Sequence, residues 1–195
     1  MFHSLTRARP TRWKHDRFGN VGKNGSQYLP IVLSRVKMVF PSNVVHKKMF
    51  VDDHSVDDTA QIARMFNWEV FINPETGIPS GANEALRHVD CPFFVSVEQD
   101  VVLTRNWFRK ISSHMNDQSV AVAQGVRIAT EPTLRKTDER WLQTGEPKIK
   151  YLSMNNNIFR TTAIREIGGF PSECPICCDT ILMKKLTIRS IDLGW

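Results

Sequence analysis

The sequence predicts an α/β domain built on a mainly parallel sheet that is covered by helices. Short strand-like segments alternate with helical patterns over residues 26–195, and the connections between them are short. Two of the strand-like segments end in acidic residues, Asp52-Asp53 after the first and Glu98-Gln99-Asp100 after a later one. Right-handed crossovers bring the carboxyl ends of parallel strands to one edge of the sheet, where ligands bind.

Length and composition are those of a soluble single domain. The 195 residues suffice for a sizeable core, and 41% are apolar and 24% charged. No apolar run approaches the roughly 20 residues of a membrane span, and the basic N-terminus lacks the apolar segment of a secretory signal.

The net charge of +6 comes from the N-terminus, since residues 1–25 hold six Lys or Arg against one acid. We interpret residues 1–25 as a basic arm or linker that is disordered and solvated. The alternative is contact with nucleic acid or with an anionic membrane surface. The rest of the chain is close to neutral and the arm has few aromatic residues, which argues against a nucleic-acid-binding protein.

Apolar residues at helical spacing predict a first helix from Tyr28 to about Phe40, with Pro30 in its first turn and Pro41 beyond its end. The elements that follow alternate between strands and helices. In order, we expect a strand at Lys48–Val51, a helix at Asp57–Phe66, a strand at Trp68–Ile72, a helix at Pro79–His88, a strand at Pro92–Val97, a helix from Thr104 and a strand at Val120–Ala123.

The alternation stops at Gln124–Lys150, a segment rich in Pro, Gly and charged residues. Loops of that length in a compact domain are usually functional or disordered, so we expect this one to border the site. Lys150–Arg160 predicts an extended segment, a short helix ends at Gly168-Gly169, and Asp179 begins a last helix.

Three of the four cysteines cluster near the C-terminus. Cys174, Cys177 and Cys178 lie together, Cys91 lies apart, and no Cys or His pair stands at zinc-ligand spacing from the cluster. We interpret all four as reduced, structural thiols of a cytosolic protein, with a local redox role as the alternative.

Carboxylates at strand ends suit Mg²⁺ or Mn²⁺, ions that one or two carboxylates share with substrate phosphates. Glu98 and Asp100 are therefore candidates for binding a nucleoside diphosphate, and Asp179 for a general base. Each has a structural alternative. The acids of Asp52–Thr59 could cap a helix, Glu98 and Asp100 could be solvent-exposed turn residues, and Asp179 could be an N-cap.

The segment Val51–Thr59, Val-Asp-Asp-His-Ser-Val-Asp-Asp-Thr, resembles the Asp-Asp-x-Ser-x-Asp-x-Thr signature of inverting family 2 glycosyltransferases with the GT-A fold. Other pieces follow in the order of that family. They are Tyr28–Ser34 as its first helix, Gly77–Asn83 as its Gly-x-x-x-Ala-Arg-Asn segment, Glu98-Gln99-Asp100 as its Asp-x-Asp motif, Ile158–Phe170 as its Phe-Arg-Arg…Gly-Gly-Phe segment, and Cys178-Asp179 as its Glu-Asp pair.

The resemblance implies a single GT-A-like domain with a Rossmann-type, mostly parallel sheet, divided into a nucleotide-binding half (26–103) and an acceptor half (104–195). It implies transfer of a sugar, with inversion, from a UDP, GDP or dTDP donor to a hydroxyl of a carbohydrate, lipid-linked or protein acceptor, with Mn²⁺ or Mg²⁺. On the donor side, the resemblance implies that Asp53 contacts the nucleobase, that Asp52 and Ser55 shape its pocket and that Asn83 binds the donor. Glu98 would lie near the ribose or the metal, and Asp100 would bind the metal. On the acceptor side, Asp179 would be the general base, and Asn155–Asn157 with the Gln124–Lys150 loop would line the site. We expect a cytoplasmic protein whose basic arm can touch the cytoplasmic face of the membrane.

The sequence also departs from the family pattern. The family begins with an apolar strand, and residues 18–27 (Phe-Gly-Asn-Val-Gly-Lys-Asn-Gly-Ser-Gln) do not match it, so we predict that the first strand is missing. Ala82 replaces the family Arg, Cys178 replaces the Glu before the base, and the sequence stops before the C-terminal elements that often follow. The second hypothesis is therefore a catalytically impaired, glycosyltransferase-like binding or scaffolding domain.

Overall fold

The computed structural model describes residues 16–126, 128–132, 135–136, 152–174, 176–188 and 192–194. Their centre is a seven-stranded sheet with the strand order β3-β2-β1-β4-β6-β5-β7. In this sheet β6 is antiparallel to its neighbours β4 and β5, and every other recorded strand pair is parallel. The predicted α/β class with a mainly parallel sheet is confirmed.

The elements have these bounds in chain order: β1 Asp16–Gly22, α1 Leu29–Val39, β2 Val45–Asp52, α2 Thr59–Met65, β3 Glu69–Ile72, α3 Ile78–Arg87, β4 Phe93–Ser96, α4 Trp107–His114, β5 Val120–Gln124, β6 Asn157–Arg160, α6 Thr161–Glu166, α7 Cys178–Ile188 and β7 Asp192–Gly194. Most of the predicted strands and helices fall on these elements to within a few residues at each end, but β6 begins seven residues after the start of the predicted extended segment Lys150–Arg160. No helix in the described part of the chain is long and apolar enough to cross a membrane.

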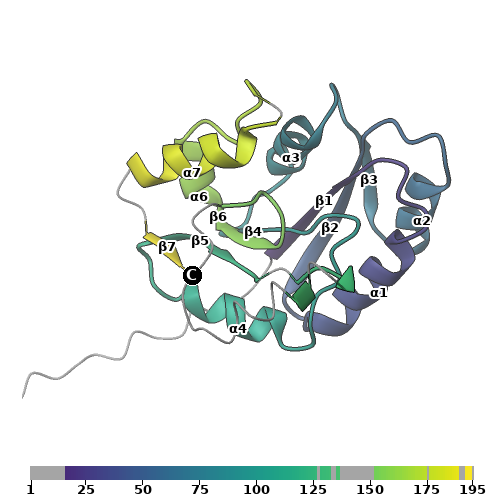
Figure 1. The fold of residues 1–195 in the computed structure, drawn as a ribbon, viewed down its shortest axis with the longest axis horizontal. Helices are drawn as coiled ribbons and strands as arrows, with labels where there is room; N and C mark the ends of the chain where they lie inside the picture. The colour runs from purple at the N-terminus through teal and green to yellow at the C-terminus, as the bar shows by residue number, and fades with distance from the viewer. Residues whose placement is uncertain are drawn as a thin grey trace, which may run out of the picture.

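Helices cover both faces of the sheet (Figure 1). Each face has its own apolar core. One core joins Leu29 and Leu33 of α1 to Phe50 of β2 and to Trp107 and Phe108 of α4. The other is built from residues of α3, α6 and α7 together with the opposite face of the strands, among them Met49, Phe94, Leu86, Ile164 and Leu182. The alternation of Met49, Phe50 and Val51 between the two cores is the period of a strand that is buried on both faces.

The prediction that the first strand is missing is wrong. β1 occupies the centre of the sheet, where Gly19 pairs in parallel with Met49 of β2 and with Ser96 of β4. Residues 16–25 therefore belong to the folded domain and not to the arm, whose residues 1–15 lie outside the described part of the chain.

Close packing explains why β1 has so few apolar side chains. A Cβ atom on Gly19 would lie 2.5 Å from the Phe94 ring, so the larger side chain of β4 fills the space that β1 leaves. Gly81 of α3 stands equally close to Val21, which lets the helix approach the strand. Contacts with neighbouring elements thus override the weak strand preference of glycine and asparagine.

Candidate functional site

The acidic loop after β2 is held by its own side chains. Asp53 is 8% exposed. Its Oδ1 accepts hydrogen bonds from Asn73 Nδ2 at 2.7 Å and from the Gly77 N–H at 3.1 Å, and the same N–H also lies 3.1 Å from Oδ2. Gly77 has a φ of 87°, a conformation that favours glycine, and this turn aims its N–H at the carboxylate. Asp53 therefore joins the end of β2 to the start of α3.

Asp52 and Ser55 support the same loop. Asp52 is 4% exposed, and its Oδ2 accepts a hydrogen bond from the Ser55 N–H at 3.1 Å. Ser55 Oγ in turn accepts from the Asn24 N–H at 3.0 Å. The acidic loop is thus bonded to the segment that connects β1 with α1.

Asp57 and Thr59 strengthen that connection. Asp57 accepts hydrogen bonds from the Ser26 N–H at 3.1 Å and from the Thr59 N–H at 3.0 Å, and Thr59 Oγ1 accepts from the Gly25 N–H at 2.7 Å. A hydrogen bond from the Thr59 hydroxyl, with smaller contributions from Ser26, lowers the pKa of Asp57 to about 2. Burial opposes part of this shift. Two residues of the predicted signature therefore fix the loop after β1.

The second acidic motif follows β4 and is bonded to the segment before β6. Glu98 Oε2 accepts a hydrogen bond from Asn155 Nδ2 at 2.7 Å, and the preceding Met154 N–H donates to Asp179 Oδ1 at 2.8 Å. Adjacent residues of one segment thus bind the candidate donor-side carboxylate and the candidate base. Burial raises the pKa of the Cys178 thiol, and the charges of Asp179 and Glu98 raise it further, which indicates that α7 begins close to Glu98.

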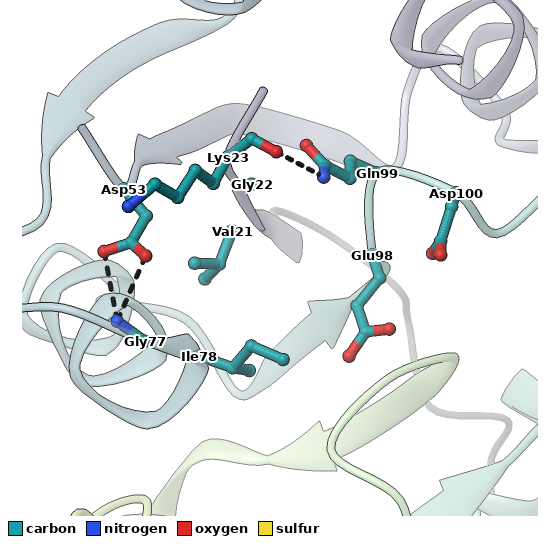
Figure 2. A pocket seen from close by; sticks show the side chains of 9 residues that line it. All are labelled: Val21, Gly22, Lys23, Asp53, Gly77, Ile78, Glu98, Gln99 and Asp100. Carbon is teal, nitrogen blue, oxygen red and sulfur yellow. Dashed lines mark hydrogen bonds between the residues drawn. The ribbon is translucent and has the colours of Figure 1, made fainter. Parts of the chain in front are cut away.

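A cavity of about 260 Å³ lies between the two acidic motifs. Its lining comes from the ends of β1 and β4, the acidic loop and the start of α3: Val21, Gly22, Lys23, Asp53, Gly77, Ile78, Glu98, Gln99 and Asp100. Figure 2 shows Asp53 on one side of this space and Glu98 with Asp100 on the other. The sequence prediction that both acidic strand ends meet at one edge is confirmed.

Six of the nine lining residues were not predicted as site residues from the sequence, among them Gly22, Lys23 and Gln99. Gln99 Nε2 donates to the Lys23 carbonyl oxygen at 2.9 Å, and Gln99 Oε1 lies 2.3 Å and 2.1 Å from where Cβ atoms of Gly22 and Gly25 would be. The glycines therefore form a slot for the Gln99 side chain. The signal in the sequence was the run Gly-Lys-Asn-Gly, which we had assigned to the arm.

Four predicted site residues do not line the cavity: Asp52 and Ser55, which support the acidic loop, and Asp179 and Asn83. Asp179 is in the first turn of α7, where it binds the Met154 N–H. The next residue, Asn155, binds Glu98 at the cavity. Asn83 binds the Phe170 backbone, donating from Nδ2 to its carbonyl and accepting its N–H at Oδ1, both at 2.8 Å. Asn83 thus links α3 to the Gly168-Gly169-Phe170 segment.

The acceptor-side prediction is only partly inside the described residues. Asn156 and Gly125 exchange hydrogen bonds, since the Gly125 N–H donates to the Asn156 carbonyl and Asn156 Nδ2 donates to the Gly125 carbonyl, each at 2.8 Å. These bonds fix the start of the Gln124–Lys150 loop against the segment before β6. Residues 133–134 and 137–151 lie outside the described part of the chain.

The cysteine prediction needs a correction. Cys174 and Cys177 form a disulfide, so they are not reduced thiols, whereas Cys91 and Cys178 are free and buried as expected of structural thiols. The spacing of three residues in the disulfide places it in the turn before α7. The prediction was wrong because the spacing of two cysteines does not show whether they are joined.

The carboxylates at the cavity fit a metal ion that is shared with a substrate. Within the described residues, no group of three or more His, Cys, Asp and Glu side chains could hold an ion alone. Mg²⁺ usually takes one or two protein carboxylates and completes its shell with water and substrate phosphates. Glu98 and Asp100 supply such a pair at the cavity wall.

Comparison with known families agrees with this fold and site. The model of glycosyl transferase family 2 matches residues 24–177, which is most of the chain, so the chain belongs to glycosyl transferase family 2. Searching curated proteins gives no match. The matched range contains both acidic motifs.

Solved structures with similar folds include S. aureus TarS 1–349, at 18% identity and a TM-score of 0.68 over 89% of this chain and 55% of that one. The mannosyltransferase PcManGT from Pyrobaculum calidifontis, in complex with GDP-Man and Mn²⁺, has 15% identity and a TM-score of 0.66 over 96% of this chain and 56% of that one. Glucosyl-3-phosphoglycerate synthase from Mycobacterium tuberculosis, in complex with UDP, has 11% identity and a TM-score of 0.70 over 93% and 69%. These similarities show the GT-A fold, and the chain spans little more than half of the first two structures.

Proposed function

We propose that the chain is the catalytic domain of a nucleotide-sugar glycosyltransferase that transfers a sugar with inversion to an acceptor hydroxyl. The observation that carries this proposal is the cavity whose wall holds Asp53 on one side and Glu98 with Asp100 on the other. A nucleoside diphosphate has a base at one end and a charged diphosphate at the other, and this cavity has carboxylates on two opposite sides. Membership of glycosyl transferase family 2 supports the same reaction class.

In this proposal, Asp53 receives the base, and Asp52 and Ser55 keep the loop around it in place. Asp53 suits that role because Asn73 and Gly77 hold its carboxylate in a fixed position before any ligand binds. A preorganised group loses little conformational freedom on binding, which favours affinity. Solved structures of similar fold in complex with UDP-GlcNAc and with GDP-Man are consistent with a nucleotide-sugar donor.

Asp100 and Glu98 are the residues that would hold Mn²⁺ or Mg²⁺ beside the diphosphate. When bound, such an ion acts as a Lewis acid and stabilises negative charge on the leaving diphosphate. Asn155 orients Glu98 through the 2.7 Å hydrogen bond described above, so Glu98 is aimed before the donor arrives. Related structures in complex with Mn²⁺ support a divalent ion.

Asp179 is the proposed general base. Inversion by direct displacement requires a base on the acceptor side, opposite the leaving diphosphate. This role is supported by the Met154–Asn155 segment, whose adjacent residues bind Asp179 and the proposed metal-binding residue Glu98. The Met154 N–H holds the carboxylate as the acceptor hydroxyl loses its proton to it.

The alternative of an impaired binding or scaffolding domain loses its main support. That hypothesis rested on a missing first strand, and β1 is present in the centre of the sheet. The departures at Ala82 and Cys178 remain, but Cys178 stands beside the proposed base and does not replace it.

Two substitutions separate the donor-side and acceptor-side roles. We expect Asp100→Ala to remove the Mn²⁺ dependence of UDP or GDP binding in calorimetry, while Asp117→Ala, an exposed acid after α4, leaves it intact. Asp179→Asn should retain nucleotide binding but abolish sugar transfer. Unchanged Mn²⁺ dependence in Asp100→Ala contradicts the metal assignment, and unchanged transfer in Asp179→Asn contradicts the base assignment.

A further inference from the structure

We propose that Lys23 determines which nucleobase the cavity accepts. Together with Asp53 it would recognise a base edge on which a ring N–H stands next to a carbonyl oxygen. Uracil, thymine and guanine have such an edge, and cytosine and adenine do not. The inference rests on the proposed function, because it requires a nucleotide donor in this cavity.

The main chain at Lys23 is fixed from both acidic motifs. Gln99 Nε2 binds the Lys23 carbonyl oxygen from the end of β4. The next residue, Asn24, donates its N–H to Ser55 Oγ at 3.0 Å and accepts the Val56 N–H at Oδ1 at 2.9 Å, which ties it to the loop after β2. The start of the Lys23 side chain is therefore held at a defined point of the cavity wall.

The Lys23 side chain lies on the base side of the cavity. Figure 2 shows it extended toward Asp53 and away from Glu98 and Asp100. The residue is exposed, and no hydrogen bond or ion pair joins its ammonium group to another described residue. Its charge is therefore available to a ligand at the Asp53 end and is remote from the place proposed for the diphosphate.

Asp53 retains capacity for one more donor. An ionised carboxylate has about four acceptor positions on its two oxygens. Oδ1 already accepts from Asn73 Nδ2 and from the Gly77 N–H, whereas Oδ2 shares only the Gly77 N–H. One ligand N–H can thus bind at Oδ2.

The two side chains together present an acceptor beside a donor. A ring N–H can donate to Asp53 while the neighbouring carbonyl oxygen accepts from the Lys23 ammonium group, and both bonds involve a charged partner. On cytosine and adenine the corresponding ring nitrogen is an acceptor and the neighbouring group an amine. Those bases would direct a lone pair at the Asp53 carboxylate and N–H groups at the ammonium, which is unfavourable at both positions.

The test compares UDP, GDP, CDP and ADP by calorimetry in the presence of Mn²⁺, with the wild-type chain and the Lys23→Met variant. For the wild type we expect UDP or GDP to bind at least about tenfold more tightly than CDP and ADP, as for other paired polar contacts to a base edge. Lys23→Met should lower the affinity for the preferred nucleotide by about tenfold and leave CDP and ADP nearly unchanged. Lys37→Met, the same change on the exposed side of α1, should alter none of the affinities.

Three results would overturn the inference, and they are distinguishable. Equal affinity of the wild type for all four nucleotides would refute base selection while leaving nucleotide binding intact. An equal loss of all four affinities in Lys23→Met would show that the ammonium group binds the diphosphate instead. No binding of any nucleotide would refute the proposed function, and this inference with it. A melting curve of Lys23→Met that matches the wild type is the check that the variant is folded.

Discussion

Asn83→Ala is expected to destabilise the fold without weakening nucleotide binding. The family resemblance assigned Asn83 to the donor, but its amide binds both polar groups of the Phe170 backbone. Phe170 is 2% exposed, and its ring packs against Phe94 and Phe159 in the core on the α3 side of the sheet. We therefore propose that Asn83 is a structural clamp between α3 and the segment before α7.

The size of the effect follows from these contacts. Alanine removes two hydrogen bonds of 2.8 Å and leaves a backbone N–H and a backbone carbonyl without their partner. An unsatisfied buried polar group costs about 1–3 kcal/mol; for these two partly buried groups we expect the free energy of unfolding to fall by roughly 2–6 kcal/mol at most. For a domain of this length each kcal/mol lowers the melting temperature by about 2–4 °C.

Urea denaturation measures the stability, and calorimetry with UDP or GDP, at a temperature where the variant is folded, measures the binding. Glu84→Ala is the matched control on the same helix, where the lost ion pairs with Arg87 and His88 should cost no more than about 1 kcal/mol. Wild-type stability together with a reduced nucleotide affinity in Asn83→Ala would refute the clamp and restore the donor-binding role.

Three further substitutions test separate parts of the account. Gln99→Ala removes the bond to the Lys23 carbonyl, and we expect nucleotide affinity in calorimetry to fall by about two- to tenfold; wild-type affinity would contradict its positioning role. The Asp57 pKa is lowered from 3.8 to about 2 in the fold, so its contribution to stability is present above about pH 4 and is lost as the pH falls toward about 2. When the free energy of unfolding is measured at a series of pH values, Asp57→Asn should therefore lose less stability than the wild type between about pH 4 and pH 2. The same pH dependence in both proteins would contradict a stabilising role of the Asp57 charge. Asn20→Val should raise the free energy of unfolding by about 1–3 kcal/mol, because Asn20 is 1% exposed and its amide has no hydrogen-bond partner among the described residues. A loss of stability in this variant would show that the amide does have a partner.

Much of the site could be predicted because it depends on strand ends. Apolar runs that stop abruptly at acids locate the carboxyl ends of β2 and β4, and the handedness of the crossovers brings those ends together. Asp53, Glu98 and Asp100 therefore appear at one cavity, as the sequence indicated. The residue order in the signature predicted this placement without any knowledge of side-chain contacts.

The first strand could not be predicted, because its identity depends on its neighbours. Gly19 suits a central strand only because the Phe94 ring of β4 fills the adjacent space. Asn20 is buried there without a partner among the described residues, against the usual preference for apolar residues in such a position. A single sequence shows the weak local propensity of this segment and not the contacts that override it.

Contacts between distant residues account for the other misses. Gln99 and Lys23 are separated by 76 residues, and Asn83 and Phe170 by 87. No local sequence pattern predicts either pair. The sequence therefore could not show whether the Asn83 amide binds a ligand or the backbone of another segment. The Cys174–Cys177 disulfide was missed for a different reason, since spacing alone does not fix the oxidation state of a pair.

Calorimetric titration of the wild-type chain with UDP and with GDP, each with and without Mn²⁺, tests the central claim most directly. The account predicts saturable binding of at least one of the two nucleotides, and tighter binding when Mn²⁺ is present. If neither nucleotide binds under either condition while the chain is folded, the cavity between the two acidic motifs is not a nucleotide-sugar site.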